Sequence, residues 1–390
     1  MTDYTAIISG AGPAGLSSAI LLAQDGIKTA LIAPGLQDDP RTTALMDPAM
    51  RLLAYIGVWP GTIAACSAPL KRLAIADDLG HLVSAPRIEF SSTELGLEQF
   101  GFNVPLAELI PALKARAEDA GVTFITGLSK TAHDHGDHIS VATEDGAFIT
   151  ARVLLAADGA QSPLRQSLGF STSTTRFEQQ ALVTSFDHSG PHDDISTEWH
   201  KQDGPFTTVP LPGRRSALVW MSRPDKVERL MALSDPALAT EIQLESHGTL
   251  GRISNLAPRK AFAMQVQRAH RFAGHRTLLI GEAAHSMPPI GAQGLNLSLR
   301  DAATAADLII GAEDPGADSI CQAYDAARRI DVVSRLSVTG FLNHSLLSGF
   351  EGLHLARAAG LALVGKIPPL REAALNMGLR STGTLPFAMR

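Results

Sequence analysis

A glycine- and proline-rich stretch, Gly281–Asp301, has residue types and spacing that could bind an anionic or electron-rich ligand. It follows a short apolar run, Thr277–Ile280, and leads into apolar residues at helical spacing. Gly291 and Gly294 remove side chains immediately before that helix, so backbone N–H groups are left bare at the positive end of its dipole. An ordinary loop between a strand and a helix has the same composition, and this stretch alone does not decide between the two.

A second stretch, Gly10–Gly15, has the glycine spacing of a dinucleotide-binding turn. An apolar strand precedes it, a helix with a buried side follows, and a second strand, Lys28–Ala33, returns. In this pattern the first glycine permits the tight turn, the second lets the backbone approach a pyrophosphate, and the third lets the helix pack on the strand. We therefore predict a dinucleotide site at Gly10, Gly12, Ala14 and Gly15.

One position departs from that pattern. The second strand ends in Ala33, where an acidic residue usually holds the ribose hydroxyl. Asp38 or Asp39 could reach the same hydroxyl from the following loop. We expect this departure to weaken the ribose contact and to leave the pyrophosphate site in place.

In a third stretch, an apolar strand over Val153–Ala156 leads into Asp158 and Gly159, with Ser162 and Arg165 shortly after. Ser162 stands where it can cap the start of a short helix. A plain turn and a ligand contact are compatible at this place, so the motif is interpreted together with the other two.

The order and content of the three stretches resemble the group A aromatic-ring flavoprotein monooxygenases and, within them, the ubiquinone-biosynthesis hydroxylases. The resemblance runs from about residue 5 to about residue 380 and includes Thr339–His344, Ala356–Leu361 and Asn376–Gly378 near the C-terminus. It implies that FAD is the cofactor and that NAD(P)H is the co-substrate that reduces it. It also implies that O2 hydroxylates the phenol ring of a polyprenylated ubiquinone precursor through a C4a-hydroperoxyflavin.

The resemblance places further residues next to the flavin. Arg41 corresponds to an arginine near the flavin and its phosphates, although a surface arginine is the alternative. Glu282 stands where the family usually has aspartate. No catalytic base is assigned: His285 is the nearest titratable candidate, with a structural histidine as the alternative. The cofactor-binding residues expected in all are Gly10, Gly12, Ala14, Gly15, Arg41, Asn103, Asp158, Gly159, Gly281, Glu282, Pro289, Gly291, Gly294, Leu295 and Asn296.

The elements that must position these residues point to an α/β fold. We expect a Rossmann-like FAD-binding domain, similar to that of p-hydroxybenzoate hydroxylase, from residues 1–71, 100–178 and 271–330. Alternating strands with Asp, Gly and Pro turns between them predict an antiparallel β-sheet substrate domain from residues 72–99 and 179–270. Residues 331–390 are expected to form a helical C-terminal segment.

Composition excludes several other classes of protein. The net charge of −6 and the lack of a long basic run argue against a nucleic-acid partner. The two cysteines, Cys66 and Cys321, form no framework, which fits a reducing cytosol, and no metal site is expected. We see no targeting signal and no apolar run of the roughly 18 residues that span a bilayer. The expected location is cytoplasmic, with peripheral contact at the inner membrane as an open alternative.

Two other functions stay open at this point. One is an FAD monooxygenase that acts on a soluble aromatic compound. The other is a non-catalytic accessory subunit among the proteins of a quinone-biosynthesis complex, which Ala33 and Glu282 keep open because both depart from the flavin-site pattern. Neither the ring carbon, the prenyl length nor the choice of NADH or NADPH follows from the sequence.

Overall fold

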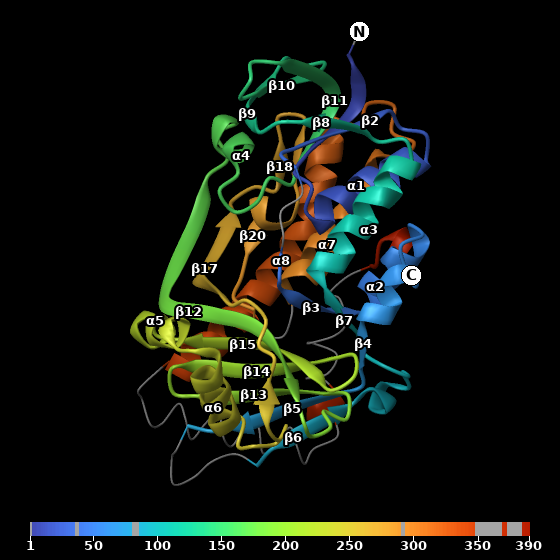
Figure 1. Ribbon diagram of the computed structural model, residues 1–390. Helices are drawn as coiled ribbons and strands as arrows, with labels where there is room; N and C mark the ends of the chain where they lie inside the picture. The colour runs from blue at the N-terminus through green and yellow to red at the C-terminus, as the bar shows by residue number, and fades with distance from the viewer. Residues whose placement is uncertain (1, 36–38, 80–85, 290–292, 348–368, 373–383) are drawn as a thin grey trace.

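The structure is a computed structural model that describes residues 2–35, 39–79, 86–289, 293–347, 369–372 and 384–390, with the backbone alone for 337–347. Figure 1 shows two large sheets, one above the other, with four helices beside the upper sheet. These helices are α1 (Pro13–Gln24), α3 (Leu106–Asp119), α7 (Gln293–Ile309) and α8 (Asp318–Leu347).

The upper sheet is built around parallel strands in the order β19-β11-β1-β2-β8, with β18 at one end and the β9–β10 hairpin added to β11. Its central strands are apolar on both faces, as expected when helices cover both sides. The strands are β1 (Tyr4–Ser9), β2 (Thr29–Ala33), β8 (Thr123–Thr126), β9 (Ser129–Asp134), β10 (Ile139–Thr143), β11 (Phe148–Ala156), β18 (Ala273–Gly274) and β19 (Thr277–Leu279).

The register of this sheet brings the three sequence motifs together. Ser9 at the end of β1 is level with Ala156 at the end of β11, and Ala156 is level with Leu279 at the end of β19. Because these strands are parallel, the loops that follow them leave from the same edge. Ligands of open α/β sheets bind outside this carboxyl edge.

The lower sheet is mostly antiparallel and has the order β20-β17-β12-β15-β14-β13-β5-β6, with β16 beside β12. Two helices, α5 (Pro224–Ala232) and α6 (Asp235–Glu245), share a buried apolar cluster with one of its faces, centred on Trp220, Phe206 and Leu182. The strands are β5 (Arg72–Asp77), β6 (Ile88–Ser91), β12 (Thr172–His188), β13 (Ile195–Lys201), β14 (Gly204–Leu211), β15 (Arg215–Ser222), β16 (Ile253–Ser254), β17 (Lys260–Ala269) and β20 (His285–Ser286).

Smaller elements join the two sheets. Strands β3 (Thr42–Met46), β7 (Gly101–Pro105) and β4 (Ala68–Leu70) form a three-stranded sheet in that order. The remaining helices and turns are α2 (Asp47–Tyr55), η1 (Thr62–Cys66), η2 (Ser92–Leu95), α4 (Pro163–Ser167), η3 (Gly281–Ala283) and η4 (Phe387–Met389).

The predicted fold class is confirmed: the protein is α/β, with an antiparallel second sheet and a helical C-terminal region. The domain boundaries stay a proposal. In its favour, the register of β12 against β17 shifts between Arg176 and Gln180, next to the proposed boundary at 178. Helix α8 is continuous through residue 331, where the C-terminal segment was expected to begin.

Among the described residues, no helix combines the length and the hydropathy needed to cross a bilayer.

Candidate functional site

The loop after β1 contains two glycines with different structural roles. Gly10 has a φ of 109°, and a Cβ there would overlap the carbonyl oxygen of Ala157 in the neighbouring loop. Gly12 has an ordinary φ of −72°, and a Cβ there would meet no atom within 4 Å. Helix α1 begins at this glycine without a side-chain cap, and Ala14 and Gly15 are buried in its first turn. The bare N–H groups and the open space at Gly12 suit an approaching phosphate.

Asp158, in the loop after β11, is half-buried, and only one of its two carboxylate oxygens has a hydrogen-bond partner among the described residues. Its Oδ2 accepts a hydrogen bond from the Leu164 N–H at 3.3 Å, whereas its Oδ1 has no partner among the described residues. Burial raises the pKa of Asp158, although hydrogen bonds from Ser162 and Leu164 act in the opposite direction. A buried carboxylate oxygen without a donor is costly. Asp158, with Gly159 beside it, is therefore placed to accept a hydrogen bond from a ligand hydroxyl.

Arg165 joins the second loop to the third. Its Nη1 donates to the carbonyl of Ala283 at 2.9 Å and its Nη2 donates to the carbonyl of Ala160 at 2.9 Å. The side chain is almost completely buried. Sequence reasoning placed Arg165 in a motif but missed this bridge, because no local pattern distinguishes a buried arginine from the usual exposed one.

The third loop turns through Gly281, and a buried carboxylate binds both Gly281 and His285 in it. Asp301 Oδ2 accepts hydrogen bonds from the Gly281 N–H at 2.9 Å and from His285 Nε2 at 2.7 Å. Burial alone would raise the pKa of Asp301, but its electrostatic interactions and hydrogen bonds with His285 and Arg328 outweigh burial and hold that pKa below its usual value. His285 Nδ1 is buried and without a partner in the described part of the chain. Glu282, between Gly281 and His285 in the sequence, is exposed.

Arg41 is exposed, directly before β3, and lies over Phe262 of the lower sheet. Its Nε and Nη2 bind Asp39 at 2.8 and 2.5 Å, and its guanidinium carbon is 5.4 Å from the ring centroid of Phe262 on β17. The hydrogen bond to Asp39 raises the pKa of Arg41 despite partial burial, and the negative charge of Glu282 adds to the shift. Arg41 and Glu282 are thus electrostatic neighbours. Asp39, one candidate for the ribose contact, is engaged by Arg41 instead.

The start of α7 presents backbone rather than side chain. Gly294 and Leu295 lie in its first turn. The Asn296 side chain is used within the protein: its Oδ1 accepts from the Met46 N–H at 2.9 Å and its Nδ2 donates to the carbonyl of Ala44 at 2.8 Å. The backbone of this turn is the part that remains for a ligand.

Four other positions were predicted to contact the cofactor. Pro289 is exposed and ends the described part of the loop before α7. Asn103 on β7 donates from Nδ2 to the carbonyl of Pro210 at 3.1 Å, while its buried Oδ1 has no partner among residues that the structure describes. Gly291 and Asp38 lie outside the described residues.

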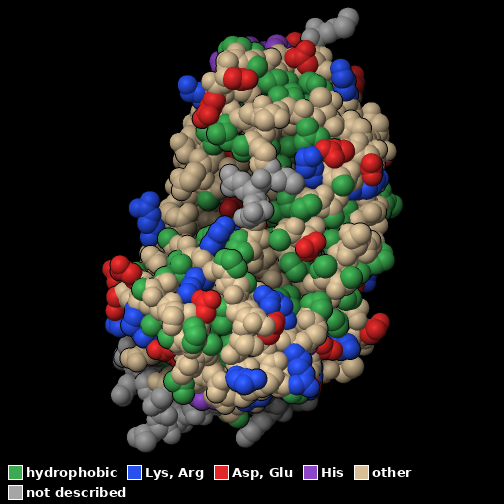
Figure 2. Space-filling model, in the orientation of Figure 1, with side chains coloured by type: hydrophobic (Ala, Val, Ile, Leu, Met, Phe, Trp, Pro, Cys, Tyr) green, Lys and Arg blue, Asp and Glu red, His purple; other side chains and the backbone are tan. Residues whose placement is uncertain are grey.

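These features together fit FAD. The bare start of α1 suits a pyrophosphate, the unpaired Oδ1 of Asp158 suits a sugar or ribityl hydroxyl, and the start of α7 suits the electron-rich end of a flavin ring. The first two lie at the carboxyl edge of the upper sheet, and Gly281, just after the end of this edge's third strand, lies next to Ala14 of α1 and Ser298 of α7. Figure 2 shows the surface hollowed between the upper and lower halves, beside the grey atoms.

Comparison with known proteins gives the same assignment over most of the chain. The family model described as "FAD binding domain" matches residues 3–336. Ubiquinone hydroxylase UbiL of Rhodospirillum rubrum is 30% identical, over 97% of this chain and 91% of that protein. The 3-demethoxyubiquinol 3-hydroxylase of Escherichia coli is 27% identical, over 95% of this chain and 97% of that protein. The crystal structure of p-nitrophenol 4-monooxygenase PnpA from Pseudomonas putida superimposes with a TM-score of 0.79 at 18% identity, over 98% of this chain and all of that one, which shows a shared fold.

Proposed function

The chain belongs to the FAD binding domain family, and we propose that it hydroxylates the phenol ring of a polyprenylated ubiquinone precursor with NAD(P)H and O2 as co-substrates. The enzyme class, an FAD-dependent aromatic-ring monooxygenase, is that of its relatives. The observation that carries the substrate proposal is the 30% identity to a ubiquinone hydroxylase over 97% of the chain. That match includes the lower sheet and the C-terminal helix as well as the three cofactor loops.

The residues of the cofactor site bind different portions of FAD. Bound FAD supplies the electron-transfer and oxygen chemistry that no side chain of this protein can supply. The N–H groups at the start of α1, beside Gly12, bind the pyrophosphate, and the Asp158 carboxylate accepts a hydroxyl hydrogen bond. The N-terminus of α7, at Leu295 and Asn296, favours negative charge on the reduced ring through its dipole.

Glu282 and Arg41 form the polar border of this cofactor site. The family usually has aspartate where Glu282 stands, and glutamate keeps the charge with one more methylene. Because Glu282 is exposed and attracts Arg41, its carboxylate has room to reach a ribityl hydroxyl. We therefore expect this departure to be tolerated.

The substrate ring is assigned to the face of the lower sheet that lies opposite α5 and α6. On this face Phe262, Ala181, Met221 and Val219 form an apolar cluster. Strand pairing places Ala181 level with both Phe262 and Met221, so these side chains are on one face, and Phe262 lies under Arg41. An apolar wall next to the cofactor loops suits an aromatic ring and excludes water from it.

No side chain is assigned as a catalytic base. The Nε2 of His285 is engaged by Asp301, so we give His285 the role of holding the third loop. The electron-rich phenol ring supplies part of its own activation.

We further propose that the protein works in the cytoplasm and meets its substrate at the inner membrane, in contact with other proteins of ubiquinone biosynthesis. The support is chemical: a polyprenyl chain partitions into lipid, so a protein without a route to the bilayer would meet little of it. Vesicle flotation checks this part, and a protein that stays in the soluble fraction with and without substrate in the vesicles would contradict it.

The substrate proposal is tested with the FAD-loaded protein. Oxidation of NAD(P)H and the mass of the product are followed with a prenylated phenol in detergent micelles, and in parallel with p-nitrophenol and 4-hydroxybenzoate. We expect the prenylated phenol to accelerate flavin reduction and to gain one oxygen atom. Turnover of the soluble phenols alone would overturn the substrate assignment and leave the flavoprotein assignment intact.

A variant separates ring binding from cofactor binding. Val219→Trp fills space on the proposed ring face, so it should abolish hydroxylation while the protein retains its FAD spectrum. Leu244→Trp, at an exposed position on α6, serves as its control and should keep both.

A further inference from the structure

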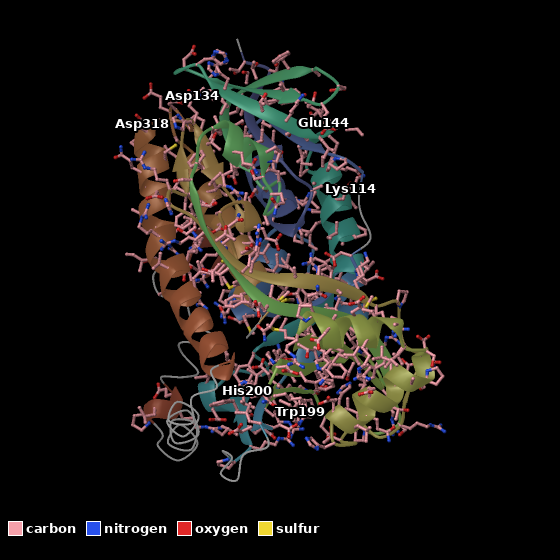
Figure 3. The ribbon with its side chains drawn as sticks, turned by 90° about the vertical axis from the view of Figure 1, so that its left-hand side faces the viewer. Lys114, Asp134, Glu144, Trp199, His200 and Asp318 are labelled. Carbon is pink, nitrogen blue, oxygen red and sulfur yellow. The ribbon has the colours of Figure 1, made fainter. Side chains whose placement is uncertain are left out.

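One face of helix α8 is buried over three turns. Tyr324, Arg328, Asp331 and Arg335 are spaced by four, three and four residues, which places them on the same side of a helix. None of them is more than 7% exposed. Figure 3 shows α8 running from Asp318, at the upper end of the molecule, along its side towards the lower sheet. This buried face lies against the segment that includes the third cofactor loop.

The first contact is at the strand that leads into that loop. The hydroxyl of Tyr324 donates to the carbonyl of Leu279, the last residue of β19, at 2.9 Å. This bond fixes the point from which the loop departs.

The second contact is at the turn itself. Arg328 Nε donates to Asp301 Oδ1 at 2.6 Å. The other oxygen of the same carboxylate accepts from the Gly281 N–H and from His285 Nε2, at 2.9 and 2.7 Å. Asp301 therefore joins both ends of the Gly281–His285 turn to the guanidinium of a single residue on α8.

The third contact is along α7. Asp331 accepts from Arg300 at 2.6 Å and from Arg328 at 2.9 Å, and Arg335 donates to Gln293, the first residue of α7. One face of α8 thus contacts the end of β19, the turn after it and the beginning of α7. These are the elements that carry Glu282, Leu295 and the other residues assigned to the flavin.

Stability alone is a weak explanation for this arrangement. A buried ion-pair network is often no more stabilising than apolar side chains of the same volume. Moreover, Arg328 Nη2 and Arg300 Nε are buried without a partner among the described residues, which adds to the cost. What the network provides is geometry, because charged hydrogen bonds define distance and direction where apolar contacts do not.

We propose that Arg328 is a positioning residue for FAD, which acts through Asp301 to hold the Gly281–His285 turn in the shape that binds the flavin. The inference rests on the cofactor site proposed above and is independent of the identity of the substrate. It makes the C-terminal helix a fourth part of the cofactor site, in addition to the loops after β1, β11 and β19. Arg328 is expected to make no contact with FAD itself.

The test compares three variants. Arg328→Met removes the guanidinium and keeps most of the side-chain volume, Arg328→Lys keeps a cation that can reach Asp301, and Arg329→Met is the matched control. Arg329 is the adjacent residue, half-exposed and paired with Asp325. For each full-length protein, the FAD dissociation constant is measured by flavin fluorescence well below the melting temperature, with the visible spectrum of the bound flavin and the melting temperature of the apoprotein.

We expect Arg328→Met to weaken FAD binding about tenfold to a hundredfold, the range of one hydrogen bond to a charged group, and to shift the flavin absorption bands. Arg328→Lys should recover part of the affinity, and Arg329→Met should match the wild type. A purely structural role predicts a lower melting temperature with wild-type FAD affinity and spectrum in the folded protein, and that result would overturn the inference.

Tyr324→Phe keeps the proposal testable if Arg328→Met does not fold. It removes only the hydroxyl that donates to Leu279, so the helix packing is retained, and we expect a severalfold loss of FAD affinity. If Arg328→Met does not fold, unchanged FAD affinity in Tyr324→Phe would overturn the inference that this face of α8 positions the turn. Failure of the cofactor site itself gives a different result: Gly12→Val would then bind FAD as the wild type does.

Discussion

Replacing Gly12 and Gly10 by alanine separates a glycine that the ligand needs from a glycine that the fold needs. Gly12 has φ −72° and ψ 170°, which alanine adopts readily, and a Cβ there meets no protein atom within 4 Å. The apoprotein of Gly12→Ala should therefore be as stable as the wild type, or more stable by about 0.4–1 kcal/mol through the reduced entropy of its unfolded chain.

FAD binding by the same variant should decline, because the new methyl group occupies the space in front of α1. Displacing a phosphate from one backbone N–H at this helix start costs a charge-assisted hydrogen bond, about 1.5–3 kcal/mol, or roughly tenfold to a hundredfold in affinity. The stability gain and the affinity loss have opposite signs, which makes the pair of measurements diagnostic.

Gly10→Ala should behave in the opposite way. Its φ of 109° costs a residue with a Cβ about 1–3 kcal/mol, and the overlap with the Ala157 carbonyl adds to that cost. We expect a lower melting temperature for the apoprotein even without FAD. Thermal unfolding gives the apoprotein stability of both variants, and titrations followed by flavin fluorescence give their FAD affinities. The reasoning is refuted if Gly12→Ala loses as much apoprotein stability as Gly10→Ala, or if it binds FAD with wild-type affinity.

Three other changes test the electrostatics of the site. Burial raises the pKa of Asp158 in the folded protein. The ionised carboxylate therefore costs no stability below the pKa of the unfolded chain, and the cost grows as the pH rises from there through the pKa of the folded state. Asp158→Asn should stabilise the apoprotein against urea at neutral pH, yet weaken FAD binding. Asp301→Asn removes one of the two carboxylates that pair with the buried Arg328 and should cost about 3–5 kcal/mol. Because the pKa of Asp301 is held low, the stability that it contributes is present above the unfolded pKa and is lost as the pH falls through the folded one, and the asparagine variant should lack that acid dependence. Arg41→Met should change the melting temperature of the apoprotein little, since an ion pair as exposed as Arg41–Asp39 contributes under about 1 kcal/mol, but it should lower FAD affinity severalfold. Arg51→Met breaks another exposed ion pair, with Asp47, and as the control it should alter neither quantity.

The elements of the fold followed from local sequence patterns where those patterns were strong. Apolar runs followed by a glycine within three residues predicted β1, β11 and β19, and helical spacing after Gly294 predicted α7. The prediction of three loops at one ligand site, however, came from resemblance. Only the observed register, with Ser9, Ala156 and Leu279 level across the sheet, places these loops at one edge.

Contacts between distant residues could not be predicted from the sequence. Asn296 was expected beside the flavin, but nothing in its surroundings along the chain indicates that its side chain would bind Met46 and Ala44. Likewise, Arg165 and Arg328 are buried cations with distant partners. Arg165 binds Ala283, which is 118 residues away along the chain, and Arg328 binds Asp301, which is 27 residues away. A single sequence contains the residue types but not the pairings, because pairing depends on how the elements pack.

The distribution of unpaired polar atoms shows where this protein departs from the rule that buried polar groups are satisfied. Among the described residues, ten buried side-chain atoms lack a hydrogen-bond partner. Four of them belong to residues that follow within ten positions of the ends of β11 and β19: Asp158, Arg165, His285 and Ser286. A folded chain tolerates such atoms at a cost of about 1–3 kcal/mol each, so their concentration in one region calls for a reason other than packing. A ligand with many donors and acceptors satisfies some of them directly and fixes the others in place. For the atoms that FAD reaches, the cost of leaving them unpaired is recovered when FAD binds, and this gain is part of the FAD affinity that sets how far the cofactor stabilises the folded protein.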